Sequence, residues 1–398
     1  MSPIDRRRWL YLTLLVASLA INLVDRQVLA VLAPVIREEL GLSPVQYSYI
    51  VTAFLLGLAL AQLPSGMFLD RVGVRWGLPV LIAWWSAANA LHGLARNVWH
   101  LCGFRFLLGV GECGNYSAGV KVIAQWFPAR ERALAGGIFN SGTVLGSFLA
   151  PYFVVQVSHH YGWRLAFVLV SLLGVVWLAP WLLIYRERSA GEDPPPRIPL
   201  RPLLRRRQIW GAVLIRTLAG PVMHFYWYWL PEYLKRERGF TMDMIGLWAG
   251  VPFLFAGVGN VGGGWFAAVL MRQGWSADRT RKTIFLTCGA LCLISSLVPF
   301  ASQRMIALAL ICLATFAMGA LTANNIGLLT DLFSPQVIAR ITGLTGMCEG
   351  FHTMLVTLAT GAIVQRLGYW PVFLAMGLLP TLAVSALFLL VRRVERVE

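Results

Sequence analysis

Long apolar runs alternate with short polar segments along the whole chain. Twelve runs approach or exceed the length of about 20 apolar residues that a helix needs to cross a bilayer. The pattern therefore predicts an all-α polytopic membrane protein with twelve transmembrane helices. The predicted spans are residues 10–35, 46–69, 76–95, 98–127, 133–157, 163–185, 209–231, 244–270, 283–301, 304–331, 341–365 and 370–391.

Composition supports the membrane assignment. Hydrophobic residues make up 58% of the chain, charged residues only 13%, and the mean hydropathy is +0.66. A soluble domain has about 25% charged residues. The six cysteines lie in apolar runs without metal-type spacing, which indicates small buried side chains and predicts no metal site.

The net charge of +16 would suggest a nucleic-acid partner in a soluble protein. Membrane proteins instead concentrate Lys and Arg in their cytoplasmic loops. With the N-terminus inside, 22 of the 34 basic residues fall in inside segments and eight in outside segments. We therefore expect a multi-pass protein of the cell (inner) membrane, with both termini in the cytoplasm and no nucleic-acid partner.

A Pro-rich, basic segment divides the chain near its middle. We predict an N-terminal six-helix bundle at 1–185, a cytoplasmic central loop at 186–208 and a C-terminal six-helix bundle at 209–398. A weak internal repeat supports this division, because residues 161–167 and 367–373 match at an offset of 206. Parallel repeats of this kind are typical of some transporters.

Two opposite charges lie within one apolar run. Arg105 and Glu112 are seven residues apart, so they share one helix face about 10 Å apart along the axis. Each costs about 2.5–3.5 kcal/mol at the bilayer centre on insertion scales. Such residues indicate a polar pathway lined by that face.

The segment GMFLDRVGVR, residues 66–75, resembles the loop signature of the major facilitator superfamily at every defined position. The resemblance implies two pseudo-symmetric six-helix bundles that work by alternating access. It also implies a gating role at the cytoplasmic side for Asp70, Arg71 and Arg75. The second half has no acid at the corresponding place.

Residues 104–151 narrow the resemblance. They are similar to the anion:cation symporter family, which includes proton-coupled hexuronate and galactonate carriers, sialin and the vesicular glutamate transporters. Residues 226–233 (YWYWLPEY) and 245–252 resemble its bacterial hexuronate branch in particular. Gly220 and His224 depart from that branch, where we expect an acid and an aromatic residue.

Three charged residues lie at similar depth in the first and fourth spans, which are neighbours in this fold. We expect Asp25 to pair with Arg105, because an unpaired buried charge is costly. Arg26 points about 100° away from Asp25, so we expect it to bind the substrate carboxylate through two hydrogen bonds. A buried carboxylic acid suits reversible protonation, and the resemblance implies proton coupling by Glu112. Structural ion pairs are the alternative for Arg26 and Glu112, and a structural or gating pair is the alternative for Asp25 and Arg105.

Further polar residues lie in predicted spans. Arg216 is a second candidate for contacting the substrate anion, and the alternative is that its side chain extends to the cytoplasmic membrane surface. We expect the Lys121 side chain to extend to that surface. For Glu349 and His352 we expect either a local pair or a role in binding the substrate or the proton. Candidates for contacts to sugar hydroxyls, with helix packing as the alternative, are Gln62, Asn140, Tyr226, Trp229, Asn324 and Asn325.

These features predict a proton-coupled symporter that imports a small organic anion, with a hexuronate or related sugar acid as the leading substrate. A monocarboxylate or aromatic acid is the alternative, and a non-transporting sensor with a transporter fold is a further one. We expect no enzymatic activity and no cofactor, since no Walker loop or catalytic triad is present in the sequence. The expected partners are the substrate, protons and the bilayer, and the resemblance implies a monomer.

Overall fold

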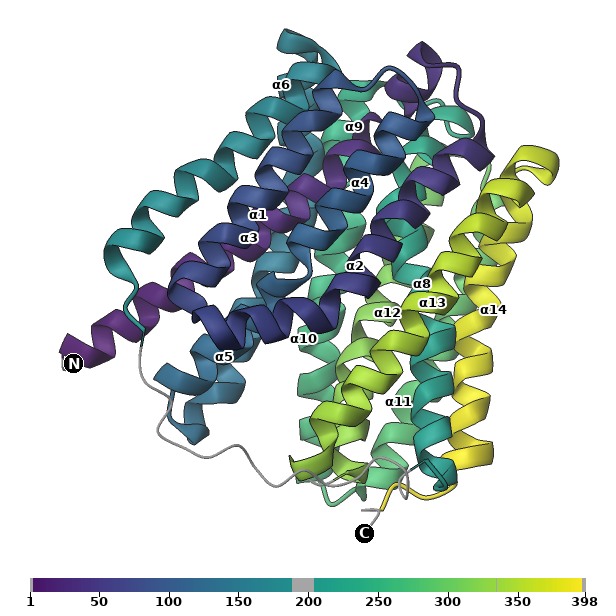
Figure 1. Ribbon diagram of the computed structural model, residues 1–398. Helices are drawn as coiled ribbons and strands as arrows, with labels where there is room; N and C mark the ends of the chain where they lie inside the picture. The colour runs from purple at the N-terminus through teal and green to yellow at the C-terminus, as the bar shows by residue number, and fades with distance from the viewer. Residues whose placement is uncertain (1–2, 188–203, 334, 396–398) are drawn as a thin grey trace. The chain divides into compact units, whose positions relative to one another are not determined.

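The computed structural model describes residues 3–187, 204–333 and 335–395, and it is helical without strands in that part of the chain (Figure 1). Each of the twelve predicted spans lies on helix. Eight described helices are long and apolar enough to cross a membrane. The elements are α1 (Pro3–Glu39), α2 (Pro44–Val72), α3 (Val74–Leu91), η1 (His92–Leu94), α4 (Val98–Glu112), α5 (Gly114–Trp126), α6 (Ala129–Ile184), α8 (Arg207–Arg236), α9 (Met242–Trp248), α10 (Val251–Arg272), α11 (Ala277–Cys292), η2 (Leu293–Phe300), α12 (Arg304–Leu332), α13 (Pro335–Leu367), α14 (Trp370–Ala386) and η3 (Leu387–Val391).

The described residues form two compact units. Unit 1 takes its residues from Met1–Glu192 and Tyr228–Gly250, and unit 2 takes its residues from Asp193–Trp227 and Val251–Glu398. Helix α8 therefore contributes to both units, since its last part, from Tyr228 on, belongs to unit 1. The predicted domain boundaries stay a prediction, and residues 188–203 of the predicted central loop lie outside the described residues.

Glycines bring helix backbones into direct contact in both units. In unit 1, a Cβ at Gly57 of α2 or at Gly109 of α4 would lie 2.3 Å from a backbone oxygen of the other helix. In unit 2, a Cβ at Gly259 of α10 would lie 2.0 Å, and one at Gly319 of α12 would lie 1.9 Å, from a backbone oxygen of the other helix. Real Cβ atoms do not approach so closely, so each unit contains a helix pair that only glycine permits.

The turns repeat between the two halves of the chain. Every glycine with positive φ in the described residues lies at a helix end or a turn, and these glycines fall into three pairs at corresponding turns: Gly41 and Gly239, Gly73 and Gly274, and Gly162 and Gly368. The last pair lies in the sequence repeat, with φ of 77° and 76°. Gly162 is also the turn that separates the two predicted spans within α6.

Replacing Gly73 by alanine is expected to destabilise the protein. Gly73 has φ 81° and ψ 160°. This conformation is essentially confined to glycine. A Cβ at Gly73 would also lie 3.1 Å from the Glu187 carboxylate. We expect Gly73→Ala to cost about 1–3 kcal/mol and to lower the thermal unfolding midpoint in detergent.

The matched control is Gly66→Ala, seven residues earlier within helix α2, where a Cβ would meet nothing within 4 Å. This variant should be neutral or slightly stabilising, because alanine is favoured over glycine in a helix. Equal midpoints for the two variants would contradict the assigned backbone strain.

Candidate functional site

An ion pair joins α1 and α4 inside unit 1. Nε of Arg26 lies 2.5 Å from Oε2 of Glu112. The Glu112 side chain is fully buried, whereas 20% of the Arg26 side chain is exposed. The residue predicted to bind a substrate carboxylate is thus bound to the residue predicted to carry the proton. A second carboxylate would have to share the guanidinium with Glu112 or displace it.

Glu112 lies at a local break within the predicted span 98–127. Helix α4 ends at Glu112 and α5 begins at Gly114, while Cys113 between them keeps helical φ and ψ of −59° and −31°. Glycines on both sides of the break pack tightly on α3: a Cβ at Gly111 would lie 2.6 Å from Trp84, and one at Gly114 would lie 2.4 Å from Leu81. Tight packing therefore holds the backbone on both sides of the acid.

The expected ion pair of Asp25 with Arg105 is absent from the described residues, and that prediction is wrong. Oδ1 of Asp25 instead accepts a hydrogen bond of 2.6 Å from Nδ2 of Asn89 on α3. Nη2 of Arg105 donates to the backbone carbonyl of Arg26 at 3.4 Å. Two residues at the same depth in the membrane need not face each other, because the direction of each side chain depends on the rotation of its helix.

The buried charges share an aromatic neighbour. The ring centroid of Phe54 lies 5.3 Å from Cζ of Arg26 and 5.9 Å from Cζ of Arg105. Both arginines are thus within cation–π range of this ring. The second oxygens of both acids, Oδ2 of Asp25 and Oε1 of Glu112, are buried as well. The cluster thus combines two guanidinium groups, two acids and one aromatic ring.

A second ion pair of the same kind lies in unit 2. Nε of Arg216 on α8 lies 2.5 Å from Oε2 of Glu349 on α13. His352 does not pair with Glu349, because its Nδ1 lies 2.7 Å from the Thr217 carbonyl oxygen. The structure therefore connects Arg216 with Glu349, which the sequence singled out separately.

Three of the predicted sugar contacts are buried and engaged in packing. The Tyr226 hydroxyl lies 2.6 Å from Oγ of Ser295, within unit 2. Trp229 is 1% exposed and lies edge-on to Tyr47, within unit 1. The carboxamide of Asn324 accepts a hydrogen bond from Arg281 and donates to two backbone carbonyls. Their assignment as substrate contacts stays a prediction.

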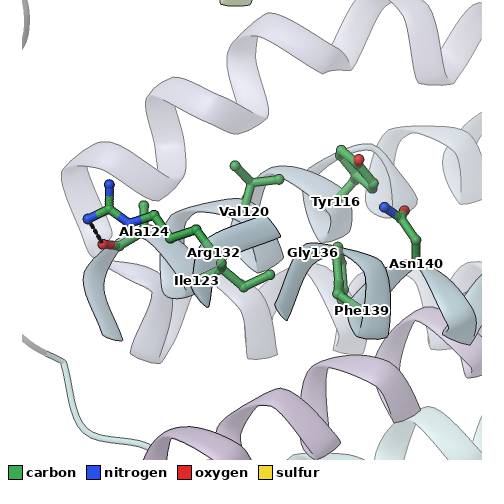
Figure 2. Close-up of a pocket in the computed structure, with 8 residues that line it drawn as sticks. All are labelled: Tyr116, Val120, Ile123, Ala124, Arg132, Gly136, Phe139 and Asn140. Atoms are coloured by element: carbon green, nitrogen blue, oxygen red, sulfur yellow. Dashed lines mark hydrogen bonds between the residues drawn. The ribbon is translucent and has the colours of Figure 1, made fainter. Parts of the chain in front are cut away.

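The other predicted sugar contacts have more exposed side chains. Gln62 is exposed on α2, and Asn325 is partly buried on α12. Asn140 is exposed and lines a pocket of about 200 Å³ between α5 and α6 (Figure 2). In this pocket Arg132 turns away toward Ala124 and donates to its carbonyl oxygen at 2.9 Å, while the ring of Tyr116 lies 5.6 Å from that of Phe139. The pocket lining is thus mainly apolar, with Asn140 as a polar group.

The family model of the Major Facilitator Superfamily matches residues 15–273, about two thirds of the chain. The chain belongs to this superfamily. Its members and this chain's relatives are transporters, so the chain is a transporter and not an enzyme.

Relatives and a solved structure agree with this assignment. The chain is 28% identical over its whole length to a hexuronate transporter of Escherichia coli K12, covering 97% of that protein. It is 29% identical over 98% of its length to a D-galactonate transporter of Escherichia coli O6:H1, again covering 97% of that protein. The fold is similar to that of a bacterial homologue of the human lysosomal transporter Spinster, with a TM-score of 0.77, 20% identity and 97% of each chain covered.

The loop signature of the superfamily is bound to α5 and to the segment that follows α6. Oδ1 of Asp70 lies 2.9 Å from Nζ of Lys121 on α5, which also donates to the Leu69 carbonyl. The backbone amide of Arg75 donates to the Glu187 carboxylate at 2.7 Å, directly after α6. Lys121 therefore pairs with an acid rather than only extending toward the membrane surface. The gating role of Asp70, Arg71 and Arg75 stays a prediction.

Two residues of this superfamily member's charge cluster were missed from the sequence. Asn89 is a single amide within the apolar run 76–95, and that isolation was a usable signal. Phe54 is one of 21 phenylalanines and stands in an ordinary apolar segment, so nothing in the sequence distinguishes it.

Proposed function

We propose that the chain is a symporter that imports a sugar acid of the hexuronate class together with protons, by alternating access. The observation that carries the proposal is the ion pair of Arg26 with Glu112, in a chain similar over its whole length to a hexuronate transporter. A guanidinium binds a carboxylate through two parallel hydrogen bonds, so it suits the group that all sugar acids share.

The pair supports a simple coupling mechanism. While Glu112 is ionised, it occupies the guanidinium of Arg26. A proton on Glu112 removes that charge, and the substrate carboxylate then takes its place on Arg26. When the substrate and the proton leave on the inner side, the pair forms again and the empty carrier returns without a proton.

The proposal includes the membrane, the oligomeric state and the partners of the transporter. The chain works as a monomer in the cell (inner) membrane with both termini in the cytoplasm, and it needs no cofactor because the proton gradient supplies the energy. Asp70, Arg71 and Arg75 gate the cytoplasmic side. The partners are the substrate, protons and the lipid bilayer.

The test is uptake of labelled glucuronate and galacturonate into proteoliposomes, with and without an inward proton gradient. Unlabelled glucarate, galactonate, lactate and benzoate serve as competitors. Gradient-driven uptake that only sugar acids inhibit is expected. Inhibition by lactate or benzoate would show that the substrate is another carboxylate and not a hexuronate. No response to any anion would overturn the role of Arg26 in substrate binding. A protein that binds sugar acids without moving them would instead be a sensor.

A further inference from the structure

The ion pair of Arg216 with Glu349 has the composition of an anion site in its own right. Besides Glu349, the guanidinium donates from Nη1 to the Thr342 carbonyl at 3.2 Å and to the Thr345 hydroxyl at 3.3 Å. All of these acceptors lie on α13, while Arg216 lies on α8. The arginine therefore spans two helices of unit 2 and uses acceptors that a ligand could replace.

A glycine makes room for this pair. A Cβ at Gly220 of α8 would lie 2.3 Å from Oε1 of Glu349. Any side chain at Gly220 would displace the Glu349 carboxylate. The missing acid at Gly220, noted as a departure from the hexuronate branch, is thus replaced in space by an acid from α13.

The exposure of the pair separates it from structural ion pairs. The side chains of Arg216 and Glu349 are 31% and 17% exposed. In contrast, the ion pair of Arg37 with Glu232 in unit 1 is buried, with side chains 1% and 0% exposed. The Arg216 side chain thus has exposed surface that the Arg37 side chain lacks.

Among the described residues, Arg216 is the charged partner of Glu349, and the other charged side chains of neighbouring helices do not pair with this acid. Helix α14 carries no charged side chain. Helix α12 carries Arg304 at its first residue, and its acid Asp331 pairs with Arg281. The histidines of unit 2, His224 and His352, lie against backbone carbonyls: Nδ1 of His352 lies 2.7 Å from Thr217 O, and Nδ1 of His224 lies 3.0 Å from Gly220 O.

We propose that Arg216 and Glu349 form a second, proton-linked carboxylate site in unit 2. A ligand carboxylate binds the guanidinium in place of Glu349, and one proton moves onto Glu349 as its charge loses its partner. No covalent bond other than that to the proton forms or breaks. The assignment to transport rests on the proposed function, but anion binding at this site does not require it.

The test is calorimetric titration of the purified full-length protein in detergent with sodium D-glucuronate, at low ionic strength. It uses the variant Arg26→Ala, which removes the first site. We expect this variant to retain binding that tightens by up to about tenfold for each unit of falling pH, as the uptake of one proton requires. Adding Glu349→Gln should make the remaining binding tight and independent of pH.

Matched conservative variants locate the binding. In the Arg26→Ala background, Arg216→Lys keeps the positive charge but cannot form bidentate hydrogen bonds with the ligand carboxylate. This variant should weaken binding about tenfold or more. Arg281→Lys changes the other arginine–acid pair of unit 2 and should leave binding unchanged. Thermal unfolding of each variant verifies that it is folded.

The outcomes distinguish the two proposals. Loss of all glucuronate binding in folded Arg26→Ala, or equal binding after Arg216→Lys, would overturn the second site while leaving the first intact. Binding that persists but ignores both pH and Glu349→Gln would overturn the proton linkage. Binding at Arg216 in a protein that transports nothing would overturn the proposed function and keep the second site.

Discussion

Arg26→Ala is expected to abolish proton-driven uptake and to weaken sugar-acid binding at the first site by about thirtyfold or more. Truncating one partner of a buried, hydrogen-bonded charge pair costs about 2–5 kcal/mol, and about 1.4 kcal/mol corresponds to a factor of ten. The variant removes the guanidinium that would bind the carboxylate, and it leaves the fully buried Glu112 without its partner. The measurements are uptake into proteoliposomes and binding to the purified protein.

Stability must be separated from binding in this test. An uncompensated buried charge costs about 3–5 kcal/mol, so Arg26→Ala alone should also unfold at a lower temperature. The double variant Arg26→Ala with Glu112→Gln removes both charges, so it should recover stability but not uptake. The control Arg164→Ala breaks an ion pair with Glu39 in which the two side chains are 44% and 45% exposed. Such exposed pairs contribute little, so this control should retain uptake. Normal uptake by Arg26→Ala would remove Arg26 from the substrate site.

Glu112→Gln is expected to abolish accumulation of the substrate against its gradient while preserving exchange of labelled for unlabelled substrate. Glutamine is similar in shape to a protonated glutamic acid but cannot release a proton, so the guanidinium of Arg26 stays available to the substrate at every pH. Exchange needs no net proton movement, so it should persist and should lose its dependence on pH. Both activities are measured in the same proteoliposomes.

The control for this variant is Glu39→Gln, from the exposed ion pair with Arg164. It changes an acid of the same unit that lies outside the charge cluster, and it should accumulate substrate as the unchanged protein does. Accumulation by Glu112→Gln at the same level would refute its proton-coupling role. Loss of both accumulation and exchange in a folded Glu112→Gln would show that the acid is needed for binding rather than for coupling alone.

The sequence predicted the long helices of the fold, but it predicted only some of the contacts between them. Length and apolarity decide where a membrane helix runs, so all twelve predicted spans lie on helix. The break after Glu112 was not predicted, because it depends on how closely Gly111 and Gly114 pack against α3.

The candidate site shows the same limit. Arg26 and Glu112 were singled out because charges are costly in apolar helices, yet their pairing was not predicted. That pairing depends on the rotation of α1 about its axis, which Asn89 of α3 helps to fix through Asp25. Asn324 was assigned to sugar contacts as an amide in a predicted span, and this assignment stays a prediction. Its hydrogen bond from Arg281 spans 43 residues and cannot be read from spacing.

The close contact of Gly220 with Glu349 has a consequence for the evolution of this transporter branch. Since a side chain at position 220 and the carboxylate of Glu349 occupy the same volume, a larger residue at position 220 requires the Glu349 side chain to take another conformation. The ion pair with Arg216 in its present geometry therefore depends on a glycine at position 220, and we expect aligned relatives that keep this pair to keep that glycine.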